Sequence, residues 1–176
     1  MAARERTTVP LSSRQILIGG ALAGMLGAIL MGFAGSAYIA SIGGGWSTPM
    51  QAIAGTYYKS MAFVGGPGVT TIGVLTHLAI GGGFGVILAA LTRRMRSHWG
   101  RFWIGIPFGI AVWALMTYVT LPVFDWVMLP RVEMMGVMWF FLHWIYGAFT
   151  GLVIPGAGAG EVAVKRRVIE PHLRTA

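Results

Sequence analysis

The chain has 176 residues, of which 56% are hydrophobic and only 10% are charged. A soluble domain carries roughly 25% charged residues, so this composition indicates an integral membrane protein. The net charge is +8, but the basic residues stand in separate groups between apolar runs, which argues against a nucleic-acid partner. The absence of cysteine excludes disulfide, thiolate and iron–sulfur chemistry.

The chain begins with a short basic arm, residues 1–14, which we expect to be a retained cytoplasmic segment. The apolar run that follows is too long for a signal-peptide core. Residues 16–42 are the first predicted membrane span, because about 20 apolar residues cross the hydrocarbon core. Gly20, Gly24 and Ala28 form a stripe of small residues there, which is typical of closely packed helices in lipid.

An outer connection separates the first span from the second, residues 69–91. Its Ser47-Thr-Pro49 segment supplies a cap and a first-turn proline. We therefore predict a short helix over residues 49–63 that lies on the outer leaflet or dips into it.

A basic inner loop leads to the third span, residues 102–123, and the fourth span covers residues 134–154. Asp125 and Glu133 lie between these two spans and are expected at the outer interface. The membrane domain as a whole covers residues 15–160, and a basic cytoplasmic tail, residues 161–176, follows it.

A short phrase occurs twice in the chain. The first copy is His77-Leu-Ala-Ile-Gly81 in the second span, and the second is His143-Trp-Ile-Tyr-Gly147 in the fourth. Residues four apart share one face of a helix, so each copy places an imidazole above bare backbone. An ionisable ring inside a membrane span is costly and therefore indicates a functional site.

The placement of charge and of glycine predicts the topology. Basic residues precede the first span, separate the second from the third and follow the fourth: Arg4, Arg6, Arg14, Arg93, Arg94, Arg96, Arg101, Lys165, Arg166, Arg167 and Arg174. By the positive-inside rule both termini are cytoplasmic. The Gly20–Gly24 spacing recurs at Gly105 and Gly109 in the third span. We therefore predict an all-α, four-transmembrane-helix bundle built from two duplicated helical hairpins.

With His–x₃–Gly on the second and fourth of four helices and a longer first outer loop, the chain resembles the YagU-like family of small bacterial inner-membrane proteins. The resemblance implies a four-helix fold with internal duplication and localisation in the bacterial inner membrane. It points to His77, Gly81, His143 and Gly147, and it implies no activity.

Two readings of the paired histidines stay open, beside other cofactor or proton roles. In the first, His77 and His143 ligate the iron of a b-type haem, because the second and fourth helices are diagonal in an up-down-up-down bundle. Gly81 and Gly147 would then supply a wall free of side chains, and Trp113, Phe141, Trp144 and Tyr146 would line the rest of the site. In the second, each ring only bonds a carbonyl or hydroxyl of a neighbouring helix, such as that of Thr76, Thr117, Tyr118 or Thr150.

No nucleophile elbow, phosphate loop or metalloprotease motif is present, and no carboxylate falls within a predicted span. These observations favour a non-catalytic accessory or anchor subunit of a larger membrane complex, respiratory or redox in kind. Its partners would be the lipid bilayer and other membrane subunits or further copies of itself. The alternative is a small carrier or channel with a path between the two repeats.

Overall fold

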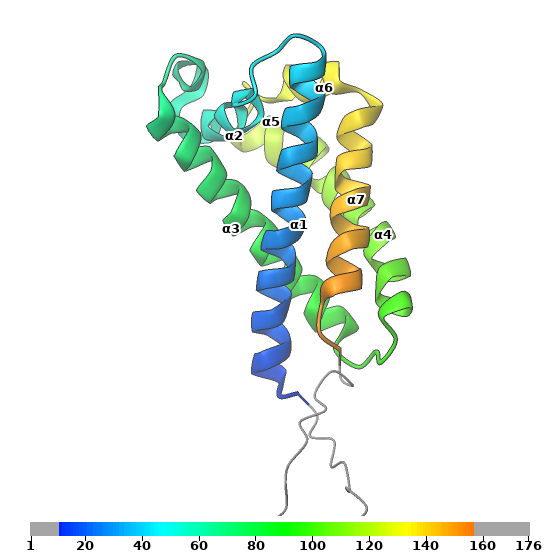
Figure 1. Ribbon diagram of the computed structural model, residues 1–176. Helices are drawn as coiled ribbons and strands as arrows, with labels where there is room; N and C mark the ends of the chain where they lie inside the picture. Colours follow the sequence, from blue (N-terminus) through cyan, green and yellow to red (C-terminus); the bar gives the residue numbers. More distant parts are fainter. Residues whose placement is uncertain (1–10, 157–176) are drawn as a thin grey trace, which may run out of the picture.

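The computed structural model describes residues 11–156, which are helical without any strand (Figure 1). Most of the basic arm and the whole basic tail lie outside this range. Four long helices form the bundle: α1 (Ser13–Ser41), α3 (Pro67–Thr92), α4 (His98–Leu115) and α7 (Val137–Val153). The shorter elements are α2 (Thr48–Tyr58), the 3₁₀ helix η1 (Lys59–Phe63), the π-helical turn η2 (Met116–Thr120), α5 (Leu121–Phe124) and α6 (Leu129–Met135).

Three helical segments are long and apolar enough to cross a membrane: Ser13–Ser41, Pro67–Thr92 and His98–Phe124. A fourth is added if α6 and α7, which meet at a bend of 90°, count as one span. The all-helical, multi-pass membrane class expected from composition is therefore found, with three or four spans.

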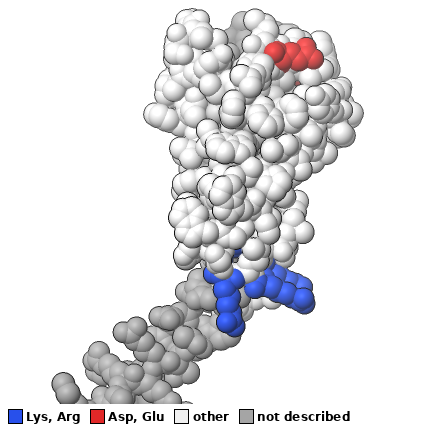
Figure 2. Space-filling model, turned by 90° about the vertical axis from the view of Figure 1, so that its right-hand side faces the viewer, with Lys and Arg blue, Asp and Glu red and all other residues white. Residues whose placement is uncertain are grey.

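Charge divides the molecule into two ends (Figure 2). The ends of α1, α3 and α4 that carry Arg14, Arg93 and Arg101 form what we call the basic end. The opposite end, the far end, carries α2, α5 and α6 together with Asp125 and Glu133 (Figure 1). Because a span places its two ends at opposite membrane surfaces, this division gives the molecule a polarity along the membrane normal.

Glycines set the closest helix contacts. α1 packs on α3, where a Cβ at Gly20 or Gly24 would lie under 3.0 Å from atoms of Gly85. α4 packs on α7 in the same manner, with a Cβ at Gly109 blocked by the His143 carbonyl. Gly20 and Gly24, read from the sequence as a packing stripe, therefore bring two backbones into contact.

Breaks at the far end interrupt two of the expected spans. The third is regular only to Leu115 and continues through the π-turn η2 into α5. Pro122 explains this position, because proline lacks the N–H that would bond the carbonyl four residues earlier. The fourth helix begins at Val137, three residues later than expected, since Gly136 has a left-handed φ of 51° and turns the chain.

The predicted short helix of the first connection divides into α2 and η1. α2 packs on α3 and α1, and Met50, Ala52 and Ala54 are buried. A Cβ at Gly73 of α3 would run into the backbone of Met50, so the two helices touch there. α2 is thus a packed part of the far end.

Candidate functional site

A cavity of about 540 Å³ lies between the helices, from their middle to the far end. α1, α2, α3, α4, η2, α5 and α7 all contribute to its wall, which is mostly apolar. Its size is that of a small-molecule pocket, and such pockets combine an apolar lining with a few placed polar groups. His77, His143 and Asp125 are the polar side chains that bear on its chemistry.

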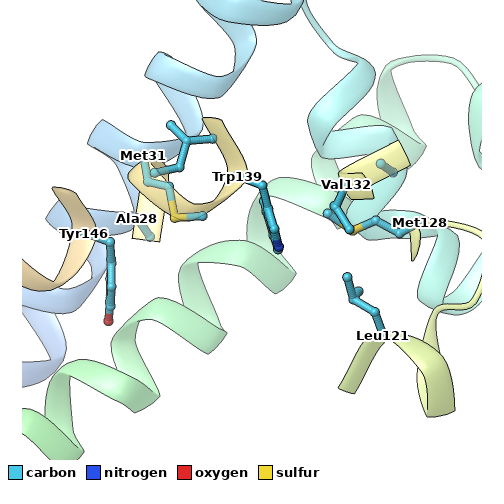
Figure 3. Close-up of a cluster of buried hydrophobic side chains, with 9 residues drawn as sticks. Ala28, Met31, Leu121, Met128, Val132, Trp139 and Tyr146 are labelled. Atoms are coloured by element: carbon cyan, nitrogen blue, oxygen red, sulfur yellow. The ribbon is translucent and has the colours of Figure 1, made fainter. Parts of the chain in front are cut away.

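A cluster of buried apolar side chains extends from the middle of the bundle to the far end (Figure 3). Its members are Ala28, Met31, Ala52, Leu121, Met128, Val132, Trp139, Leu142 and Tyr146. Trp139 of α7 lies in the middle of this cluster, between Tyr146 and Met31 on one side and Leu121 and Met128 on the other. Its indole Nε1 donates to Thr117 Oγ1 at 2.8 Å, which fixes the ring against the π-turn. The cavity wall is therefore well anchored where α7 meets α4.

His77 reaches the cavity about 15 Å along α3 from Pro67, given a helical rise of about 1.5 Å per residue. Its Nε2 lies 2.9 Å from the carbonyl oxygen of Ala28 on α1. A carbonyl only accepts, so Nε2 carries the proton and donates. In the neutral ring the lone pair of Nδ1 is then left for another partner.

His143 approaches the same cavity from α7 and is only 3% exposed. Its Nδ1 donates to the carbonyl oxygen of Trp139, one turn earlier, at 3.0 Å. The imidazole meets the Trp139 ring edge-on, with 4.2 Å between ring centroids. Here the lone pair of Nε2 is the one left for another partner.

The structure brings both histidines to one cavity and also gives each a backbone partner. His77 bonds a neighbouring helix, whereas His143 bonds its own. None of the hydroxyls considered from the sequence is the partner of either ring. A ring N–H donated to a carbonyl is the arrangement that orients a metal-ligating histidine, so these bonds suit ligation as well as packing.

The glycines of the repeated phrase serve helix packing. A Cβ at Gly81 would lie 3.0 Å from the carbonyl oxygen of Gly24, and one at Gly147 would lie 2.7 Å from Gly109. A neighbouring helix therefore packs on both bare faces, and Gly81 also lines the cavity whereas Gly147 does not. A further bond joins the two copies, since Tyr146 Oη donates to the Gly81 carbonyl at 2.6 Å.

Of the four aromatic residues expected to line a haem site, only Tyr146 does so. Tyr57, Phe84, Phe124 and Trp139 line the cavity in place of the other three. Trp113, Phe141 and Trp144 do not line the cavity. Their position along the chain does not give the rotation of each helix, and that rotation decides where a side chain points.

Asp125 is a residue of the cavity that sequence reasoning did not identify. It stands in the connection between α5 and α6, yet it is 2% exposed and lines the cavity. Its carboxylate accepts from Thr56 Oγ1 of α2 at 2.9 Å and from the backbone N–H of Met128 at 3.1 Å. The available signal was a lone carboxylate inside the apolar stretch 121–130.

Burial raises the pKa of the Asp125 carboxyl above its ordinary value. Loss of water outweighs the opposing effects of its two hydrogen bonds and of the nearby Lys59 and Arg131 charges. The ionised carboxylate is therefore costly where it stands, and a positive partner in the cavity would relieve that cost.

Four methionines, Met31, Met50, Met116 and Met128, also line the cavity. Methionine side chains are flexible and polarisable, and they adapt to ligands of varied shape. Between residues 11 and 156, no three side chains among His, Asp and Glu gather closely enough to hold a metal ion. The thioether side chains give the cavity a wall that can adapt to an organic ligand.

Comparisons with known proteins return no match, whether with protein-family models, with curated proteins or with solved structures.

Proposed function

We propose that this chain is a non-catalytic membrane protein that holds an apolar small molecule in the cavity between its helices. One observation carries the proposal: His77 and His143, from helices far apart in the sequence, line one apolar cavity with a ring lone pair left on each. Such a site can bind and orient a ligand.

Haem b is the metal-bearing ligand that the two imidazoles support, and it would make the chain an accessory subunit of a redox complex. The lone pairs and the apolar wall suit iron ligation. The propionate groups of haem fit less well, because the buried carboxylate of Asp125 faces the same cavity and would repel them. Partner subunits or further copies of the chain would have to bind away from Gly20, Gly24, Gly105 and Gly109, whose faces pack inside the chain.

A ligand search tests the proposal. The protein is extracted with its lipids and purified, its visible absorption spectrum is recorded, and retained small molecules are identified by mass spectrometry. We expect a bound molecule that is lost in Gly32→Leu, which adds a side chain to the cavity wall beside His77. If that molecule is haem b, its spectrum should also disappear in His77→Ala and His143→Ala. The proposal would be refuted if the wild-type protein retained no small molecule and Gly32→Leu changed neither the spectrum nor the mass-spectrometric result.

A carrier is the second candidate function, and the helix breaks favour it. The π-turn η2 and the bend at Gly136 both lie next to the cavity's far end. Such breaks are common at functional sites and at hinges. Uptake or efflux of the identified ligand by vesicles that contain the protein would distinguish a carrier from a subunit that only holds it.

We also propose that both termini are cytoplasmic, that the two hairpins are duplicates and that the protein lies in a bacterial inner membrane as a YagU-like member. The basic end supports the orientation, and the similar glycine contacts of α1 with α3 and of α4 with α7 support the duplication. Ser97→Cys in the loop between α3 and α4 should react with a membrane-impermeant thiol reagent only after the membrane is opened. Labelling of this cysteine in intact cells would show that the opposite orientation is the correct one.

A further inference from the structure

The cavity has polar groups at two levels with apolar wall between them. His77 and His143 lie near mid-depth, and Asp125 lies at the far end, where α5 ends. Met31, Met50 and other apolar residues make up the wall. A ligand that fills this space is therefore mostly apolar.

The polar atoms that the two histidines and Asp125 offer to such a ligand are acceptors. The hydrogen-bonded N–H of each histidine is already donated to a carbonyl, so the remaining ring nitrogen offers a lone pair. The Asp125 carboxylate accepts two hydrogen bonds, whereas its two oxygens have about four lone-pair positions. A ligand group that pairs with these three side chains therefore brings a proton donor or a positive charge.

The two cations nearest Asp125 are engaged elsewhere. Lys59 Nζ donates to the carbonyls of Thr56 and Phe124 at 3.0 and 3.1 Å. The Arg131 guanidinium donates to the Val127 carbonyl and stands 3.9 Å above the ring of Phe63. In the described part of the chain neither comes within the 4.0 Å of an ion pair with the carboxylate. A charged partner for Asp125 can still come from a ligand.

We propose that the cavity binds a lipophilic organic monocation, with its positive group at Asp125 and its apolar body among the aromatic and methionine side chains. This inference rests on the proposed function, because it names the class of ligand for the same cavity. Tyr57 and Phe124 line the cavity together with Asp125 and add aromatic faces, which attract cations. An anion of the same shape would meet the carboxylate and the lone pairs, and both repel it.

A buried carboxylate without an ion-pair partner has an energetic consequence that supports this assignment. The pKa of Asp125 is raised by desolvation, so its ionised form weakens the empty protein. A bound cation would compensate the charge and stabilise the folded state by mass action. A ligand cation would supply the ion-pair partner that Lys59 and Arg131 do not give this carboxylate.

Two ions of nearly equal size and shape but opposite charge test the proposal: tetraphenylphosphonium and tetraphenylborate. Their binding to the wild-type chain in lipid nanodiscs is measured by equilibrium dialysis, and binding to empty nanodiscs is subtracted. We expect saturable binding of the phosphonium ion and at least roughly tenfold weaker binding of the borate ion, because one unpaired buried charge costs several kcal/mol. Equal binding of the two ions overturns the proposal without any variant.

Asp125→Asn keeps the shape of the side chain but removes the charge; its amide oxygen can accept from the Met128 N–H and its NH2 group can donate to Thr56 Oγ1. Cation binding should weaken by roughly tenfold or more, and Asp125→Glu should restore most of it. The matched control is Glu133→Gln, since Glu133 is exposed on α6 and does not line the cavity. It should change cation binding by less than about twofold.

Gly32→Leu tests whether the two ions bind in the cavity. If it abolishes binding of both ions whereas Asp125→Asn leaves their ratio unchanged, the cavity holds ligands and the cation assignment is wrong. If it leaves cation binding intact, the ion binds elsewhere and the cation assignment fails, whereas the proposed function is still decided by the ligand search.

Discussion

In the half of the bundle toward the basic end, α1 touches α3 and α4 touches α7 through glycine backbones, with no room for side chains between them. In the half toward the far end, α3 diverges from α1, and side chains from seven helical segments line a cavity (Figure 1). The same helices build both regions. The positions at which glycine lets backbones meet therefore decide where a ligand is excluded and where one fits.

The glycine contacts toward the basic end should be the most sensitive part of the molecule. Gly147→Leu forces a side chain into the backbone of Gly105 and Gly109, and we expect a loss of stability on the order of 3 kcal/mol or more. Thermal unfolding in detergent, followed by size-exclusion chromatography, measures it. Gly83→Leu is the matched control, because a Cβ there meets nothing within 4 Å. Equal stability of the two variants would contradict the glycine argument.

The hydrogen bond from Tyr146 to Gly81 joins the two regions, because it connects α7 with the start of the α1–α3 contact. Tyr146→Phe leaves a buried carbonyl without this donor and should cost about 1 kcal/mol. The same unfolding assay measures it, with Tyr118→Phe as the control, because Tyr118 is 68% exposed. A Tyr146→Phe protein as stable as the wild type would mean that the two regions are held together by packing alone.

The smallest effect, and the one opposite in sign, is expected at the far end. Asp125→Asn removes a costly buried charge and should stabilise the empty protein at pH 7 by less than about 1 kcal/mol, since Lys59 and Arg131 already offset part of the cost. The gain should depend on pH. Protonation of the raised Asp125 carboxyl favours the folded state fully below pH 3.8, its ordinary pKa, and this contribution is lost as pH rises through the raised pKa.

Unfolding temperatures between pH 4 and pH 8 measure this difference. The variant should gain on the wild type as pH rises, and Glu133→Gln, which neutralises an exposed carboxylate, should follow the wild type. A gain that is independent of pH would place its origin outside the carboxyl group.

The candidate site was only half visible in the sequence. His77 and His143 stand out because an ionisable ring is rare in an apolar run and the phrase around them repeats. Asp125 is a lone carboxylate in an apolar stretch, but its burial is not expected from the sequence, because a carboxylate in a connection is ordinarily solvated. Its burial depends on α2, which brings Thr56 from a distant part of the chain. A one-dimensional pattern does not encode that contact.

The glycines next to the histidines were likewise only partly predictable from the sequence. Their spacing correctly indicates a bare helix face, but not what covers that face. Gly81 and Gly147 were read as space for a cofactor, whereas each is covered by the glycine-bearing face of a neighbouring helix. Bare backbone attracts another backbone as readily as a ligand, and helix rotation decides between them.

The sequence by itself determined the helical membrane class, the approximate helices and the charged ends, because these follow from local hydrophobicity and from the cost of moving charge into lipid. Tertiary structure decided the cavity, the partners of the two histidines and the burial of Asp125. These depend on the rotation of each helix and on the breaks at Pro122 and Gly136, which set how far the helices separate. Hydrophobicity fixes that a helix lies in the membrane, but side-chain packing fixes which way it faces.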